Sequence, residues 1–112
     1  MRSFLLLVTS SPTSPESARA FHLALLMRSQ GNQVSVFLGQ NGVLAAICGD
    51  LHTAGTSVAQ ALAAGIHVYA LNEDLVLRGW GPGDVIPGVQ VSGYDELAEL
   101  ALEESATVSG AF

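Results

Sequence analysis

Three short apolar runs, separated by segments with helix signals, constrain most strongly what this chain can fold into. The runs are Phe4 to Val8, Val34 to Leu38 and Ile66 to Ala70. The first is continuously apolar rather than alternating, which is typical of a strand that helices bury on both faces. Strands that alternate with helices at this spacing predict an α/β fold, a three-layer α/β/α sandwich with a mostly parallel five-stranded sheet.

Helix signals lie between these runs. Ser14 matches an N-cap, and a helix is predicted from Pro15 to about Gln30, because proline suits the first helical position and Gly31 suits the end. Thr56 is the predicted N-cap of a second helix that ends at Ala64. Between the two, residues 43–48 are compatible with a short helix or an ordered loop.

The last third of the chain carries weaker signals. Residues 85–91 have a strand pattern that Pro87 and Gly88 interrupt, so we expect this strand nearer the sheet edge. Tyr94 to Glu104 has the pattern of an acidic amphipathic helix. Thr107 to Ser109 is compatible with a final short strand.

Composition narrows the class of protein. A length of 112 residues suits one domain spanning residues 1–112. Charged residues make up 12% of the chain, lysine is absent and the net charge is −6, which argues against a nucleic-acid partner. So few charges beside 49% hydrophobic residues leave apolar surface that favours self-association. We therefore expect an oligomer.

The compartment can also be anticipated. The apolar run near the N-terminus is too short for a signal peptide, and the composition does not imply a membrane span. Cys48 is the only cysteine, so an internal disulfide is impossible and an oxidising compartment gains no support. We expect a cytoplasmic protein that does not bind membranes.

The stretch from Val68 to Trp80 predicts a site. A buried strand is expected to end here and a short helix to begin, with Asn72 as its N-cap. Glu73 and Asp74 then fall in the first turn and Arg78 in the last, so the charges match both ends of the helix dipole. In a parallel sheet, binding sites lie at the carboxyl ends of the strands, where this turn is expected.

Two other segments are expected at the same edge. Asn41 and Gly42 close the second strand, and such a pair readily takes positive φ. Trp80 follows the short helix, where its ring would suit either an interface or a cover over the core. Residues 9–14 could cradle a phosphate, but they contain no glycine, lysine or arginine, so capping of the following helix is the more economical interpretation.

The stretch VYALNEDLVLRGW closely resembles the signature of the DsrH/TusB branch of the DsrE/DsrF/DsrH sulfur-relay family. Phe37 to Val43 resembles the strand and turn of that family, and Tyr94 to Leu97 falls where the family has its C-terminal helix. The resemblance implies a cytoplasmic protein that forms trimers or hexamers, from identical or paralogous subunits, and handles persulfide sulfur. Small sulfur-carrier proteins would be its partners.

A thiol is the critical feature in this comparison. In the DsrE/TusD branch a cysteine occupies the position of Leu71, and leucine can neither attack a persulfide nor carry sulfur. The DsrH/TusB branch also lacks a thiol there, which fits a non-catalytic assembly subunit. Cys48 is the one residue that could act as a catalytic persulfide carrier, although free cysteines are commonly buried core residues. Cys48, Asp50 and His52 form only a weak metal-ligand pattern, so we expect no metal or cofactor.

The charged residues of the short helix have simple interpretations. Glu73 and Asp74 are adjacent and point about 100° apart on a helix, so stabilisation of the helix start is favoured over an acid/base pair. Arg78 could pair with Asp74 at i and i+4, worth a few tenths of a kcal/mol if exposed. It could instead bind a carboxylate of a partner or a sulfur oxyanion.

Two functional classes remain. The first is sulfur transfer, either as an assembly subunit or as a sulfurtransferase-type carrier through Cys48. The second is a small-ligand or nucleotide-binding α/β module that uses the carboxyl-end rim without sulfur chemistry. An enzyme with its own active site is less expected, because the sequence shows no nucleophile triad at convincing spacing.

Overall fold

The computed structural model describes residues 3–47, 53–103 and 106–109. Its strands are β1 (Ser3–Val8), β2 (Gln33–Leu38), β3 (His67–Leu71), β4 (Gln90–Ser92) and β5 (Ala106–Ser109). They form one sheet in the order β4-β3-β2-β1-β5, and every neighbouring pair is parallel. The predicted α/β class, with a parallel sheet and helices, is confirmed.

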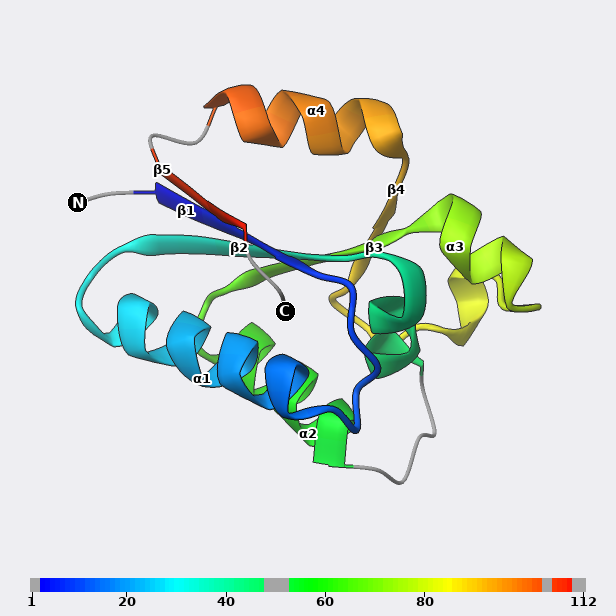
Figure 1. Cartoon of the computed structure of the whole chain (residues 1–112), viewed down its shortest axis with the longest axis horizontal. Helices are drawn as coiled ribbons and strands as arrows, with labels where there is room; N and C mark the ends of the chain where they lie inside the picture. The colour runs from blue at the N-terminus through cyan, green and yellow to red at the C-terminus, as the bar shows by residue number, and fades with distance from the viewer. Residues whose placement is uncertain (1–2, 48–52, 104–105, 110–112) are drawn as a thin grey trace.

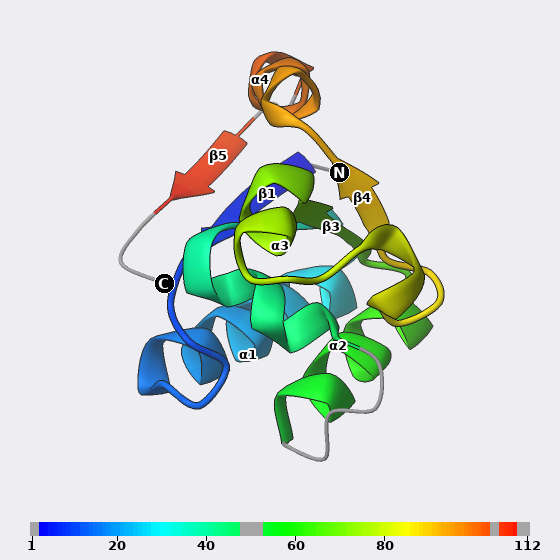
Figure 2. The ribbon, with the colours of Figure 1, turned by 90° about the vertical axis from the view of Figure 1, so that its right-hand side faces the viewer.

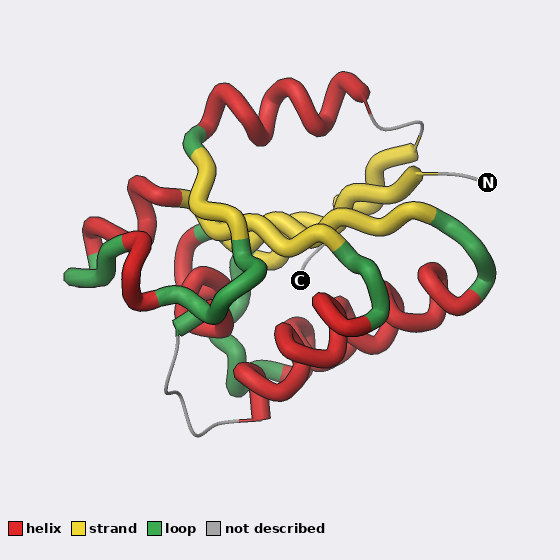
Figure 3. The backbone as a smooth tube through the Cα atoms, turned by 180° about the vertical axis from the view of Figure 1, so that it is seen from behind, coloured by secondary structure: helices red, strands yellow, loops and turns green. Residues whose placement is uncertain are grey.

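Helices cover both faces of the sheet (Figure 1). They are α1 (Pro15–Ser29), α2 (Thr53–Ala63), α3 (Asn72–Leu77) and α4 (Tyr94–Glu103), with 3-10 segments η1 (Gln40–Ala46) and η2 (Pro82–Asp84). The helices α1 and α2 lie against one face, whereas α4 lies alone on the other, as the view from behind also shows (Figure 3). Within the described residues, no helix has the length and apolar character needed to cross a membrane.

The core is built from the central strands. Leu6, Val36 and Val68 are neighbours in the register of β1, β2 and β3, and all three are buried. Successive side chains of a strand point to opposite faces. On the other face Phe37 stacks on Tyr69, with ring centroids 5.8 Å apart and an interplanar angle of 11°. Both faces are therefore apolar at the centre of the sheet, as the continuous apolar runs predict.

Local signals set the ends of α1. The Ser14 hydroxyl accepts a hydrogen bond from the Ser17 backbone N–H at 3.3 Å, and Pro15 is the first helical residue. Such an N-cap is worth about 1 kcal/mol. Gly31 follows the helix with φ of 88°, a conformation that glycine adopts without strain. The predicted helix and its N-cap are confirmed.

The start of the second helix was predicted wrongly. The helix α2 begins at Thr53, so Thr56 lies inside it and is not the N-cap. Helix propensity is a weak signal that tertiary packing overrides. Here Val58 and Ala61 are fully buried, and α2 packs against α1. The predicted end is close, since the helix ends at Ala63.

The strand signal over residues 85–91 is only partly realised. The strand β4 covers Gln90–Ser92 and lies at the sheet edge, as predicted. Val85 instead forms an antiparallel bridge with Ile47, and the Ile86 N–H donates to the Ala46 carbonyl at 2.7 Å. Pro87 has no N–H to donate to a ladder, so the strand cannot continue through it.

Candidate interaction site at the carboxyl ends of the strands

The carboxyl ends of β2 and β3 each lead directly into a short helical segment. The segment η1 follows β2 and α3 follows β3, and Figure 2 shows both at one end of the sheet. Parallel strands place their carboxyl ends at the same edge, so residues about 35 positions apart in sequence become neighbours. Two polar contacts between these segments define the candidate site.

Asp74 makes the first contact. Its side chain is largely buried, and its Oδ2 accepts a hydrogen bond from the backbone N–H of Gln40 at 2.6 Å. Gln40 has φ of 50°, the only positive value at a non-glycine residue in the described part of the chain. A hydrogen bond to a charged group contributes about 1.5–3 kcal/mol. Asp74 therefore does more than stabilise its own helix start, because it holds the first residue of η1 in this conformation.

Arg78 makes the second contact. Its Nη2 donates to Asn41 Oδ1 at 3.0 Å, while Nη1 donates to the Asp74 backbone carbonyl at 3.1 Å. Nη1 also lies 3.7 Å from Asp74 Oδ1, so the predicted i, i+4 ion pair is present. Arg78 caps α3 rather than lying in its last turn, because the helix ends at Leu77. From there its side chain reaches across to η1.

Gly42 has a different role from the one predicted. Positive φ was expected at the Asn41-Gly42 pair, but it occurs one residue earlier, at Gln40. Gly42 is needed for close approach, since a Cβ there would collide with the Val8 carbonyl oxygen and lie 3.0 Å from the carbonyl carbon. That oxygen already accepts a hydrogen bond from the Gly39 N–H at 2.9 Å. No local sequence signal shows this contact, because it depends on where β1 ends.

Leu71 is the N-cap of α3, where Asn72 was predicted. The strand β3 extends to Leu71, which pairs in register with Ser92, so the helix begins at Asn72. The Leu71 side chain is 3% exposed. The predicted cap is wrong because pairing with β4 lengthens the strand, an effect that is not local. Glu73 and Asp74 do lie in the first turn, as predicted.

Trp80 lies just beyond α3. Its N–H donates to the Leu75 carbonyl at 2.9 Å, and the Gly79 N–H donates to the Val76 carbonyl at 3.0 Å. With Gly79 at φ of 82°, these two bonds form a Schellman motif, which satisfies carbonyls at the helix end. The indole ring is partly exposed at this position.

The serine-rich loop before α1 is occupied by its own contacts. The Ser14 hydroxyl donates to the Ser11 carbonyl at 2.7 Å as well as capping the helix, and Ser11 and Thr13 hydroxyls lie 3.1 Å apart. This agrees with the capping interpretation. Cys48, Asp50 and His52 lie outside the described residues, so the thiol and metal hypotheses for them stay predictions.

The fold and the strand-end contacts define a small α/β protein with a parallel sheet and a rim built from η1 and α3. The model of a family described as DsrH like protein matches residues 13–107, so the chain belongs to this family. The predicted family relationship is confirmed. A sequence search of curated proteins found no match.

Solved structures share this fold. The structure of the ychN protein from E. coli has a TM-score of 0.87 at 20% identity, covering 98% of this chain and 100% of that one. MTH1491 from Methanobacterium thermoautotrophicum has a TM-score of 0.74 at 16% identity, covering 98% and 100%. BT1422 from Bacteroides thetaiotaomicron has a TM-score of 0.76 at 17% identity, covering 97% and 95%. At these identities the likenesses establish the fold.

Proposed function

We propose that this protein is a subunit of a DsrE/DsrH-type assembly in intracellular sulfur transfer, where it contributes to the assembly and does not carry sulfur. The family match supports a place in sulfur transfer, since the signature around β3 and α3 resembles the DsrH/TusB branch. The observation that carries the non-catalytic role is Leu71. The proposed location is the cytoplasm.

Leu71 occupies the end of β3, where the resemblance places the reactive cysteine of the DsrE/TusD branch. Its side chain is 3% exposed and belongs to the hydrophobic core. A thiolate must reach and attack the outer sulfur of a persulfide, and leucine has no group that can do so. The position that would carry sulfur in a relative therefore serves packing in this chain.

The strand-end contacts support an assembly role. Asp74 binds the Gln40 backbone and Arg78 binds Asn41, so α3 and η1 are tied into one unit. A surface that is ordered before binding loses less conformational entropy when a partner docks. The partner proposed for this unit is a small sulfur-carrier protein, and further copies of this chain in a trimer or hexamer, or paralogous subunits, complete the proposed assembly.

Intact mass spectrometry after incubation with a persulfide donor tests the role of Cys48. In a transfer, the Cys48 thiolate would attack the outer sulfur, the donor would leave as a thiol and the protein would gain one sulfur atom. We expect no gain in the wild type or in Cys48→Ser. A gain of one sulfur atom in the wild type alone would overturn the proposal and make Cys48 the carrier.

The burial of Leu71 can be tested in the Cys48→Ser background. We expect Leu71→Cys to be alkylated slowly while the protein is folded, because the site is 3% exposed. The matched control is Leu77→Cys on α3, which is 80% exposed and should react rapidly. Equal rates would show that the end of β3 is open to reagents.

Native mass spectrometry of the wild type tests the assembly itself. We expect a trimer or hexamer, or a complex with a paralogous subunit. A protein that stays monomeric both alone and with paralogous subunits would contradict the proposed assembly.

A further inference from the structure

The outward side of α3 has a stripe of exposed apolar side chains. Val76 is 60% exposed and Leu77 80%, and they follow Glu73 at i+3 and i+4 on the helix. Trp80, which is 38% exposed, lies three residues beyond the end of the helix. The i+3 and i+4 spacing places Val76 and Leu77 on the same side of α3 as Glu73, and Trp80 follows in the turn after the helix. A surface helix normally turns such a stripe toward the core, whereas here it faces solvent. We call Val76, Leu77 and Trp80 the α3 stripe.

The inward side of α3 explains why the stripe is held outward. Leu75 is fully buried, and the Asp74 carboxylate and the Arg78 guanidinium are bound to η1. Rotating the helix to bury the stripe would expose Leu75 and break both contacts. The stripe is therefore presented to solvent on a fixed support, and a partner need not order it.

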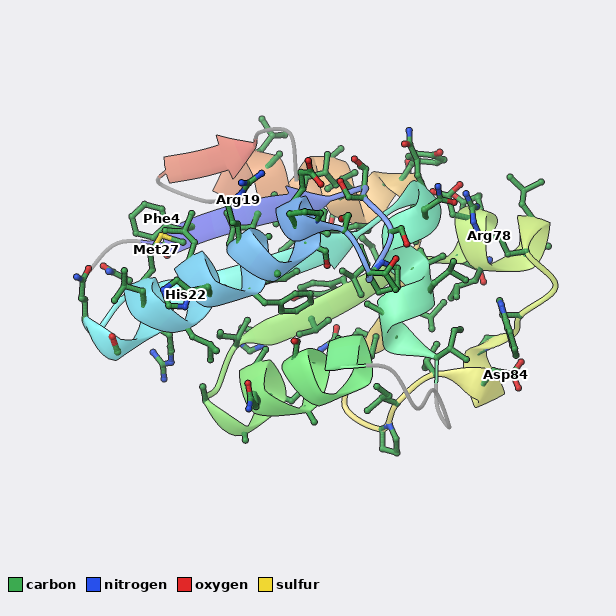
Figure 4. The ribbon with its side chains drawn as sticks, turned by 60° about the horizontal axis from the view of Figure 1, so that its bottom comes forward. Phe4, Arg19, His22, Met27, Arg78 and Asp84 are labelled. Atoms are coloured by element: carbon green, nitrogen blue, oxygen red, sulfur yellow. The ribbon has the colours of Figure 1, made fainter. Side chains whose placement is uncertain are left out.

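Acidic side chains border the stripe. Glu73 lies on the same side of α3, and Asp84 is an exposed residue of η2, the turn that follows Trp80. Figure 4 shows Asp84 and Arg78 at the same end of the molecule. Arg78 does not balance this border, because Asp74 and Asn41 already bind its guanidinium.

The first turn of α4 adds to the border. A Cβ at Gly93 would lie 3.7 Å from Glu73 Oε1, so the start of α4 lies beside α3. Asp95 and Glu96 follow in that first turn, and both are exposed. The surface thus has an apolar centre and an acidic border.

The size and charge of this surface indicate its occupant. Three side chains are too few for a stable dimer contact, which needs about 800 Å² from each partner. A second copy of this chain carries a net charge of −6, so its approach to this acidic border is electrostatically unfavourable. We propose that the α3 stripe binds a short segment of a partner protein whose apolar side chains are flanked by lysine or arginine. This deepens the proposed function by naming the chemistry of a partner, and rests on it for the role of that partner in sulfur transfer.

Trp80 is the only tryptophan of the chain and lies in the stripe, so its fluorescence reports on occupancy. The probes are two tryptophan-free peptides with the same core of leucine and phenylalanine, one flanked by lysines and the other by glutamates. We expect a saturable change of Trp80 emission with the lysine peptide, which weakens as salt is added. The glutamate peptide should produce none at the same concentrations.

Variants locate the binding surface. Leu77→Ser should weaken binding of the lysine peptide at least about tenfold, because central apolar anchors dominate small interfaces. Its matched control is Leu102→Ser on α4, which removes a leucine that is 87% exposed elsewhere on the surface and should leave binding unchanged. Glu73→Gln should weaken binding and reduce its salt dependence. Both leucines are exposed, so neither substitution is expected to prevent folding.

Three results would overturn the inference. Emission unchanged by both peptides would show that the stripe does not bind such segments. Equal binding of the glutamate peptide would show that charge is not recognised. A change of emission with the concentration of the protein alone, abolished by Leu77→Ser, would make a second copy the occupant. None of these outcomes alters the mass of the protein after persulfide treatment, so failure here and failure of the proposed function can be told apart.

Discussion

Replacement of Gly42 by alanine tests how rigidly the rim is built. The added Cβ would collide with the carbonyl oxygen of Val8 and lie 3.0 Å from its carbonyl carbon. Both are backbone atoms, so no side chain can rotate away to make room. Either the end of β1 or the segment η1 must shift.

The magnitude follows from the contacts that a shift disturbs. Forcing an extra methyl group into a packed site costs about 1–3 kcal/mol. The Val8 oxygen also accepts the Gly39 N–H at 2.9 Å, and weakening that bond adds about 1 kcal/mol. Alanine restricts the unfolded chain more than glycine, which offsets roughly 0.4–1 kcal/mol. These three contributions sum to between about 1 and about 3.6 kcal/mol, so we expect Gly42→Ala to lower the free energy of unfolding by about 2 kcal/mol.

Urea denaturation at one fixed protein concentration is the appropriate measurement, since the proposed self-association would make the apparent stability depend on concentration. Two other glycines serve as controls. A Cβ at Gly31 would meet no atom within 4 Å, but φ of 88° strains alanine, so Gly31→Ala should cost about 1 kcal/mol. Gly83 has neither a close neighbour nor a positive φ, and Gly83→Ala should change stability by at most about 1 kcal/mol.

The order of the three variants in free energy of unfolding shows whether the close approach at Gly42 is rigid. Steric collision at Gly42 should cost more than backbone strain at Gly31, and both more than the change at Gly83. If Gly42→Ala is no less stable than Gly31→Ala, the end of β1 and η1 can separate at little cost. The close approach would then not define the rim.

Two further substitutions probe contacts on which the fold and the site depend. Asp74→Ala leaves the Gln40 backbone N–H without its carboxylate acceptor, so we expect the free energy of unfolding, measured by urea denaturation, to fall by about 1–3 kcal/mol. The neighbouring Glu73→Ala is the control and should lower it by less than about 0.5 kcal/mol. Equal losses would mean that the Asp74 contact contributes nothing. Ser14→Ala removes the acceptor of the Ser17 N–H and should cost about 1 kcal/mol, while Ser14→Asp, which can still cap, should cost far less.

Much of the fold follows from local signals that the sequence displays. The helix α1 was predictable because Ser14, Pro15 and Gly31 act on backbone groups within a few residues of themselves. The central strands were predictable because a continuous apolar run is stable only where both faces are covered. The start of α2 was predicted wrongly, because its first turn contains Gly55 and has no strong local preference for helix.

The candidate site was predictable in place but not in detail. The rule that parallel strands share their carboxyl edge led to the turn after β3, and the i, i+4 spacing led to the pair of Asp74 and Arg78. The contact of Asp74 with Gln40 joins residues 34 positions apart, and no periodicity marks it. The sequence also did not predict that the α3 stripe is exposed, because the same spacing is typical of a buried helix side.

By itself, the sequence determined the α/β class, the ends of α1, the family and the absence of a thiol at Leu71. Only the tertiary structure decided that Gly42 is required for close approach, that Asp74 holds η1 and that α3 turns its apolar side to solvent. The physical reason is the range of the interactions. Caps and apolar periodicity act within a few residues, whereas the rim exists only once the register of β1, β2 and β3 has brought their ends together.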